Sequence, residues 1–215
     1  MKKLNNFLFR KKGLISLLLL LMVVVLISFV RGMDEETYYK SYDRSRVSIE
    51  GSSTIGPWSM VATAFACDGR FVLDNGLLQE ISGLSFVVPV NQLQSENPLM
   101  NETIAELFKH NEVAEIRFKQ TNAMVLSVMK MTNVIGELQI GNKSQLIELQ
   151  LAHQVNADQS LTFRGSKVLK LNDYQLKMPE SILGAIKNGN DVKVDLEITL
   201  SNKEVVLIKS KDLSE

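Results

Sequence analysis

Short segments in which apolar and polar residues alternate recur along most of this chain, and they restrict it to folds built from many strands. Turn signals separate several of them. The residues at 74–76, 141–142 and 188–189 suit hairpins, because Asn and Gly adopt positive φ at little cost. The pattern predicts an all-β fold, a barrel or a sandwich. The strands are expected at 46–55, 57–66, 69–73, 80–90, 113–120, 122–132, 134–140, 145–155, 160–171, 190–200 and 203–209.

Several of these segments are apolar on both faces. In 122–132, Met124 and Leu126 point to one side, whereas Val125 and Met129 point to the other. An open sheet with one solvated face would alternate more cleanly, as residues 190–200 do. The two-sided strands therefore need a second partner, which can be a covering helix, another protein or an apolar lumen.

One helix is expected among the strands. Asn97 supplies a cap and Pro98 a first-turn proline. Apolar residues then follow at helical spacing on one face, which predicts a helix that covers a sheet or closes a barrel end. These residues are Leu99, Met100, Ile104, Leu107 and Phe108. A short helical turn is also expected near 180–186.

Residues 14–30 form an apolar run, interrupted only by Ser16 and Ser28, that spans roughly 26 Å as a helix. Five basic residues precede it and three acidic residues follow at 34–36, which places the N-terminus in the cytoplasm and the rest outside. The run predicts either a retained single-pass signal-anchor or a signal peptide cleaved on export to the periplasm. We expect residues 1–32 to be this segment, 33–45 a juxtamembrane linker and 46–215 a single domain.

The charge of the chain is unevenly distributed. Its formal net charge is zero, but six of the 24 basic residues lie in 1–32. The remaining 18 face 24 acidic residues, so the rest of the chain carries about −6. An acidic domain argues against nucleic acid as a partner.

The residues that usually perform chemistry do not form a recognisable site. Cys67 is the only cysteine, so no intramolecular disulfide is possible, and a small buried residue is expected there. His110 and His153 lie far apart without a third metal ligand at coherent spacing. No catalytic triad, phosphate loop or carboxylate pair is present, so we expect neither an enzyme nor a cofactor or metal.

The ordered motifs of residues 46–200 resemble the YceI-like family. Residues 47–58, which contain Gly51 and end at Trp58, resemble its opening hairpin, and 84–90 resemble the strand that leads to a helix with a Met, here Met100. Residues 115–118, 136–141, 165–179 and 191–200 resemble the later strands and a Gly-x-Leu-x-Ile-x-Gly turn. One difference is that relatives often carry His-Asp before the tryptophan, where this chain has Gly56 and Pro57.

The resemblance implies an antiparallel, lipocalin-like β-barrel of about eight strands that binds a polyisoprenoid or similar amphipathic lipid in its lumen. A carrier, store or sensor of a polyisoprenoid or fatty-acyl lipid outside the cytoplasm is the function we expect. The alternative is a ligand-free interaction or scaffold module of the bacterial cell envelope. The expected ligand-binding residues are Trp58, Met60, Phe86, Leu107, Phe118, Met124 and Leu126. Trp58 and Phe118 are taken from the family motifs, and the other five follow from alternation alone.

Overall fold

The computed structural model describes residues 22, 36–41, 45–54, 56–176 and 189–202. Within these residues, ten strands form one antiparallel sheet, with one α-helix and two short 3-10 helices. The strands are β1 (Thr37–Ser41), β2 (Arg46–Ser53), β3 (Gly56–Ala62), β4 (Ala66–Asp74), β5 (Leu77–Pro89), β6 (Glu115–Leu126), β7 (Met131–Ile140), β8 (Lys143–Val155), β9 (Leu161–Lys170) and β10 (Asp191–Ser201). The helices are η1 (Val90–Gln92), α2 (Pro98–His110) and η2 (Leu171–Tyr174).

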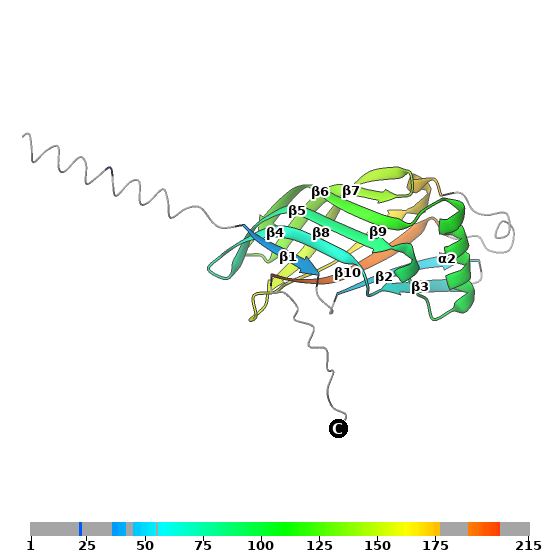
Figure 1. The fold of residues 1–215 in the computed structure, drawn as a ribbon, viewed down its shortest axis with the longest axis horizontal. Coiled ribbons are helices and arrows are strands. Elements are labelled where there is room, and N and C mark those ends of the chain that lie inside the picture. Colours follow the sequence, from blue (N-terminus) through cyan, green and yellow to red (C-terminus); the bar gives the residue numbers. More distant parts are fainter. Residues whose placement is uncertain (1–21, 23–35, 42–44, 55, 177–188, 203–215) are drawn as a thin grey trace, which may run out of the picture. The chain divides into compact units, whose positions relative to one another are not determined.

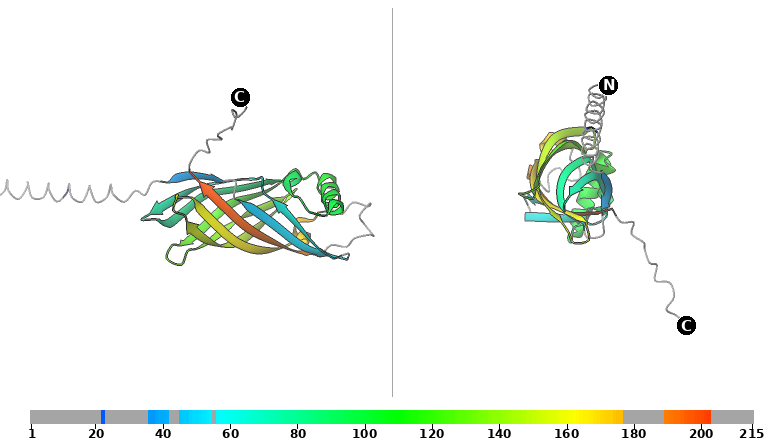
Figure 2. Two further views of the ribbon diagram at one scale, coloured as in Figure 1. Left: turned by 90° about the horizontal axis from the view of Figure 1, so that it is seen from below. Right: turned by 90° about the vertical axis from the view of Figure 1, so that its left-hand side faces the viewer.

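The sheet closes on itself. Its order is β1-β4-β5-β6-β7-β8-β9-β10, and β10 pairs with β1 to complete the ring (Figure 1; Figure 2, right). β2 pairs with the first part of β10 and β1 with its end, while β3 and β4 run antiparallel to β2 and β1 respectively. β1–β2 and β3–β4 thus act as two long interrupted strands. The expected antiparallel barrel of eight strands with a helix is confirmed.

Some expectations concern residues outside the described ones. The helix expected in 1–32, the helical turn near 180–186 and the strand at 203–209 belong to this group. Within the described residues, no helix is long and apolar enough to cross a membrane. Residues 37–41, which we assigned to a linker, form β1, because Tyr39 points into the barrel core with only 2% of its surface exposed.

α2 lies across one end of the barrel (Figure 1). The Asn97 side chain accepts a hydrogen bond from the backbone N–H of Leu99 at 3.0 Å, and Pro98 opens the helix, as expected. Leu99 itself is exposed, and Thr103 takes a place on the buried face, where its hydroxyl donates to the Leu99 carbonyl at 2.8 Å. The buried face consists of Met100, Thr103, Ile104, Leu107 and Phe108.

The half of the barrel away from α2 is filled by side chains. Tyr39 packs edge-on against Phe71 with ring centroids 5.3 Å apart, and Phe71 lies 5.8 Å from Phe163. Leu78, Leu161, Leu200 and other inward residues of this half are almost completely buried. This close packing closes the barrel at the end where β5, β7 and β9 begin.

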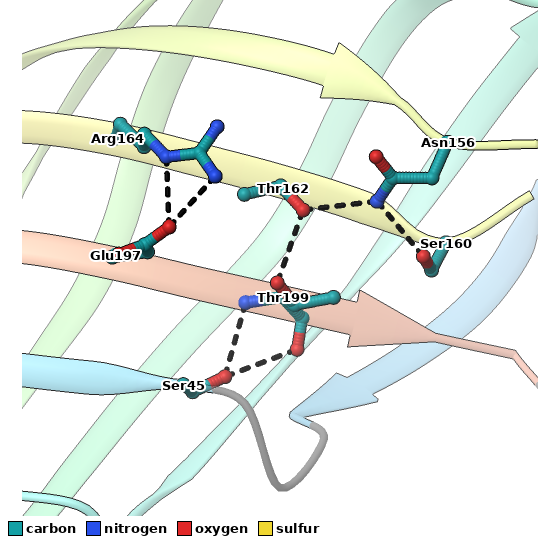
Figure 3. Close-up of polar contacts among 7 residues, drawn as sticks. All are labelled: Ser45, Asn156, Ser160, Thr162, Arg164, Glu197 and Thr199. Carbon is teal, nitrogen blue, oxygen red and sulfur yellow. Dashed lines mark hydrogen bonds and ion pairs between the residues drawn. The ribbon is translucent and has the colours of Figure 1, made fainter.

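Polar side chains complete two interrupted seams of the sheet. Ser45 precedes β2 and replaces a strand partner for Thr199: its hydroxyl accepts from the Thr199 N–H at 3.0 Å and donates to its carbonyl at 3.1 Å (Figure 3). The Gln120 amide does the same between β6 and β5, since it accepts from the Leu84 N–H and donates to the Ile81 carbonyl, both at 2.9 Å. The Ser45 and Gln120 side chains thus satisfy partly buried backbone groups where regular strand pairing stops.

A second set of side-chain contacts ties β9 to β10 (Figure 3). Asn156 donates to Ser160 and Thr162 at 2.9 Å, and the Thr162 and Thr199 hydroxyls lie 3.0 Å apart. Further along the same two strands, Arg164 pairs with Glu197 on the barrel exterior. These contacts hold the strand pair next to the closing seam in register.

His153 is part of the filled half. Its Nδ1 lies 2.8 Å from the Thr132 hydroxyl, and its ring is 6.3 Å from that of Phe163. His153 lies on β8 and points into the core, with 5% of its surface exposed. Burial, and secondarily the charge of Lys130, lowers the pKa of His153 below its ordinary value of 6.5.

The lowered pKa of His153 predicts acid sensitivity of the fold. As the pH falls through about 6.5, His153 takes up a proton in the unfolded chain but not in the folded protein. The free energy of unfolding is therefore highest above about pH 7 and decreases as the pH drops through 6.5. We expect His153→Asn, which can keep a hydrogen bond to Thr132, to reduce this loss in urea unfolding between pH 7.5 and 5 (roughly the window set by the histidine pKa). His110→Asn, at an exposed helix end, is the control and should leave the wild-type slope. Equal slopes for all three proteins would contradict the assignment.

Candidate ligand cavity

A cavity of about 170 Å³ occupies the half of the barrel next to α2. It is neither fully enclosed nor a surface groove, and of its 27 described lining residues all but Lys167 are apolar. Inward side chains of β2 to β10 contribute, together with α2, η2, Leu93 and Leu176. Along β10 the lining runs from Val192 to Ile198, a length of roughly 20 Å at ~3.3 Å per residue.

The two halves of the interior differ in how well their side chains fill the space. Phe71 and Leu161 in the filled half are 1% and 0% exposed. Inward residues at equivalent positions near α2, such as Phe86, Leu169 and Leu196, keep part of their surface accessible although they face inward. The apolar lining is therefore only partly packed, as in sites that accept an apolar ligand.

Five of the seven residues expected to bind a ligand meet at this cavity. Trp58 and Met60 reach it from β3, Phe86 from β5, Leu107 from α2 and Phe118 from β6. Whether they bind a ligand stays a prediction, but the structure brings them together around one space.

Met124 and Leu126 do not line the cavity. They are 62% and 42% exposed and point to the barrel exterior. The reason is a register shift between Gln120 and Asn122, which inserts an extra residue into β6 relative to β7. Before the shift Phe118 points inward; after it the inward positions are Ala123 and Val125, so the simple alternation was wrong by one residue.

The exterior next to this shift is apolar. Val128 and Met129, which we placed in a strand, lie in the 127–130 turn and are 88% and 69% exposed. Met124 and Leu126 continue this surface on β6. Within the described residues, this second face of 122–132 is exposed and no helix covers it.

Three cavity-lining side chains are positioned by glycines on the neighbouring strand. A Cβ on Gly51 would lie 2.3 Å from Cζ2 of Trp58, one on Gly136 would lie 2.4 Å from Cζ of Phe118, and one on Gly165 would lie 2.5 Å from Cδ2 of Leu151. In each case the large side chain occupies the space above the glycine. Gly51 and Trp58, paired across β2 and β3, thus set one wall of the cavity.

Replacement of Gly51 by alanine should displace Trp58. We expect a loss of about 1–3 kcal/mol in the free energy of unfolding, because the added methyl overpacks the indole, which outweighs the usual gain from removing a strand glycine. Trp58 is the only tryptophan, so its emission reports the displacement directly. Ser52→Ala, on the exposed side of the same strand, is the control. An unchanged emission spectrum in Gly51→Ala would show that the indole does not depend on this glycine.

Sequence reasoning missed two notable lining residues, Cys67 and Lys167. Cys67 was expected only to be small and buried, and it is 3% exposed at the cavity wall. Burial, and secondarily the charge of Asp68, raises the pKa of its thiol to about 12, which keeps it protonated and unreactive at neutral pH. Alternation along residues 161–171 could have identified Lys167. Leu161, Phe163, Leu169 and Leu171 mark the inward side, and Lys167 lies in the same series.

Among the described residues, no group of three or more His, Cys, Asp or Glu side chains is placed to hold a metal ion. The described lining offers a ligand apolar contacts and one ammonium group, that of Lys167.

The barrel has the fold of several solved bacterial proteins. It aligns with Burkholderia cenocepacia BcnA at a TM-score of 0.60 and 15% identity, over 74% of this chain and 97% of that chain. It aligns with a polyisoprenoid binding domain from Saccharophagus degradans at a TM-score of 0.59 and 13% identity, over 78% and 99% of the two chains. The Campylobacter jejuni YCEI protein aligns at 0.50 and 16% identity, over 63% and 81%.

The comparisons establish the class of fold. No family model and no curated protein sequence matches the chain. At identities of 13–16% the structural likeness shows the fold alone, and that fold is the YceI-like barrel which the motifs of residues 46–200 resemble.

Proposed function

We propose that this protein binds an amphipathic lipid of the polyisoprenoid or fatty-acyl type in the barrel and serves as a carrier, store or sensor. The observation that carries the proposal is the partly open cavity, in which 26 of 27 described lining residues are apolar. A similar barrel from Saccharophagus degradans is a polyisoprenoid binding domain, which supports the same ligand class here.

The size of the hydrophobic contribution favours a ligand with a long tail. Each buried methylene contributes about 0.8 kcal/mol, whereas association costs roughly 4–15 kcal/mol in lost freedom of motion. A tail of about twelve buried methylene groups is needed before the gain matches the middle of that range. The ~20 Å lining along β10 has the extended shape that such a tail requires.

Native mass spectrometry of the protein after mild extraction tests this proposal. We expect a co-purifying apolar molecule, and after delipidation we expect uptake of isoprenoid or fatty-acyl probes with a change in Trp58 emission. A barrel that is always empty and takes up neither kind of probe would refute the proposal.

The exterior offers one observation in favour of the alternative, an interaction module. Met124, Leu126, Val128 and Met129 form an exposed apolar surface of the kind that meets partners. In pull-downs from membranes, Val128→Glu would lose a partner bound there while lipid uptake stays intact. Loss of a partner in a protein that never takes up lipid would favour this alternative.

We also propose that the barrel works outside the cytoplasm, without catalysis of its own. The basic residues before the apolar run at 14–30 and the acidic residues after it support export, either anchored or cleaved. A protease added to spheroplasts should digest the barrel, and a barrel protected until lysis would contradict this location. The mass of the mature chain distinguishes the anchored form from the cleaved one.

A further inference from the structure

Lys167 is the single charged side chain among the described residues that line the cavity. On β9 the inward positions are Leu161, Phe163, Gly165, Lys167 and Leu169, whereas Arg164 and Lys170 are exposed on the outer face. A lysine at such a position must place its alkyl stem along apolar neighbours while its ammonium group seeks a polar partner. In the barrel register it lies opposite Val194, which cannot provide one.

The protein does not supply that partner within the described residues. The three ion pairs found there join Arg117 with Glu115, Arg164 with Glu197, and Lys193 with Asp195. The Lys167 side chain takes part in none of these pairs, and it makes no side-chain hydrogen bond within this part of the chain. An ammonium group beside an apolar cavity without a counter-ion is unfavourable unless an anion or water meets it.

A second polar group at the same cavity also lacks a partner. Nε1 of Trp58 is buried and has no hydrogen-bond acceptor in the described structure. The indole lies over Gly51 of β2, and β2 is separated from β9 only by β10, so roughly 10 Å lies between these strands. An indole N–H only donates, as does an ammonium group, so both lack the same thing, an acceptor.

We infer that the lipid carries an anionic head group, a carboxylate or a phosphate, which pairs with Lys167 and accepts a hydrogen bond from Trp58. The tail then lies along the apolar lining toward Phe118 and Ile198. This inference rests on the proposed lipid-binding function and adds the chemical class of the head group. Oxygen anions satisfy both donors at once, and charge-assisted hydrogen bonds are the stronger kind.

Matched pairs of ligands on the full-length protein test the inference. One arm compares hexadecanoate with hexadecanol, and the other compares geranylgeranyl phosphate with geranylgeraniol, so that the arms distinguish a carboxylate from a phosphate. Affinity is read from Trp58 emission. We expect wild-type protein to bind one or both anions about tenfold to a hundredfold more tightly than the matched alcohol.

The variants separate the head-group contact from the tail contact. Lys167→Met keeps the length of the stem and should bring the anion down to the affinity of the alcohol, whose own binding should change less than about twofold. Lys170→Met, on the outer face of the same strand, should behave as wild type. Trp58→Phe, followed by native mass spectrometry, should weaken anion binding by about fivefold.

The outcomes test the head-group inference separately from the proposed lipid binding. If wild type and Lys167→Met bind acid and alcohol equally well, the head-group inference is wrong while lipid binding stands. If Lys170→Met loses the preference as fully as Lys167→Met, the effect is one of general charge and the inference is also wrong. If no ligand of either arm binds, the proposed function fails and the inference fails with it.

Discussion

Replacing Leu196 by tryptophan is expected to block lipid uptake while the barrel remains folded. Leu196 lies on β10 at the cavity wall and is only partly buried, so a larger side chain can enter the open space. Displacing even two methylene groups of a ligand from that space removes about 1.6 kcal/mol, a loss of roughly tenfold or more in affinity. Titration with hexadecanoate, followed by calorimetry, measures the loss.

The control for this variant adds the same bulk to the outside of the barrel. Val168 is on β9 next to β10, and 55% of its surface is exposed. Val168→Trp should therefore bind lipid as wild type does. If Leu196→Trp binds equally well and both variants melt near the wild-type temperature, the cavity at Leu196 does not hold the ligand.

Truncating Phe71 to alanine should be the most damaging single change to stability. The ring is 1% exposed and contacts Tyr39 and Phe163 in the filled half of the barrel. Removing a ring from such packing costs about 3–5 kcal/mol, since the neighbours relax only partly into the space left behind. Urea unfolding monitored by circular dichroism gives this difference directly.

The matched truncation in the other half, Phe86→Ala, should reduce stability less and lipid affinity more than Phe71→Ala does. Phe86 faces inward from β5, as Phe71 does from β4, but it borders the cavity, and its ring centroid lies 5.0 Å from that of Phe65. We expect a smaller cost of about 1.5–2.5 kcal/mol, because the ring is already partly accessible, and a clear loss of lipid affinity. Equal destabilisation by both variants would mean that the two halves are equally packed.

The strands and the helix follow from local patterns, and for this reason sequence reasoning located most of them. Asn97 and Pro98 fix the start of α2, and the alternation around Val192 and Val194 identifies β10. β1 was missed, because its short polar segment reveals its role only through pairing with β4 and β10. Such pairing depends on residues distant in the sequence, which local patterns do not report.

The binding residues were harder to predict than the fold, for two physical reasons. The shift at Gln120 changes which side of β6 faces inward, and nothing in the residues around it marks that change. In addition, Phe71 and Phe86 are the same residue type at inward positions of neighbouring strands, yet one is packed and the other borders open space. Packing of this kind is decided by all neighbouring strands together.

The aromatic packing around Phe71 fills one end of the barrel in the described residues, so the cavity does not run through to that end. A lipid bound as proposed would then enter and leave through the half of the barrel next to α2. If the protein carries lipid as proposed, loading and delivery would be separate encounters, because a donor and an acceptor would compete for the same opening. In that case the barrel would bind lipid from one partner and release it to another, and lipid would not pass through the barrel from one side to the other.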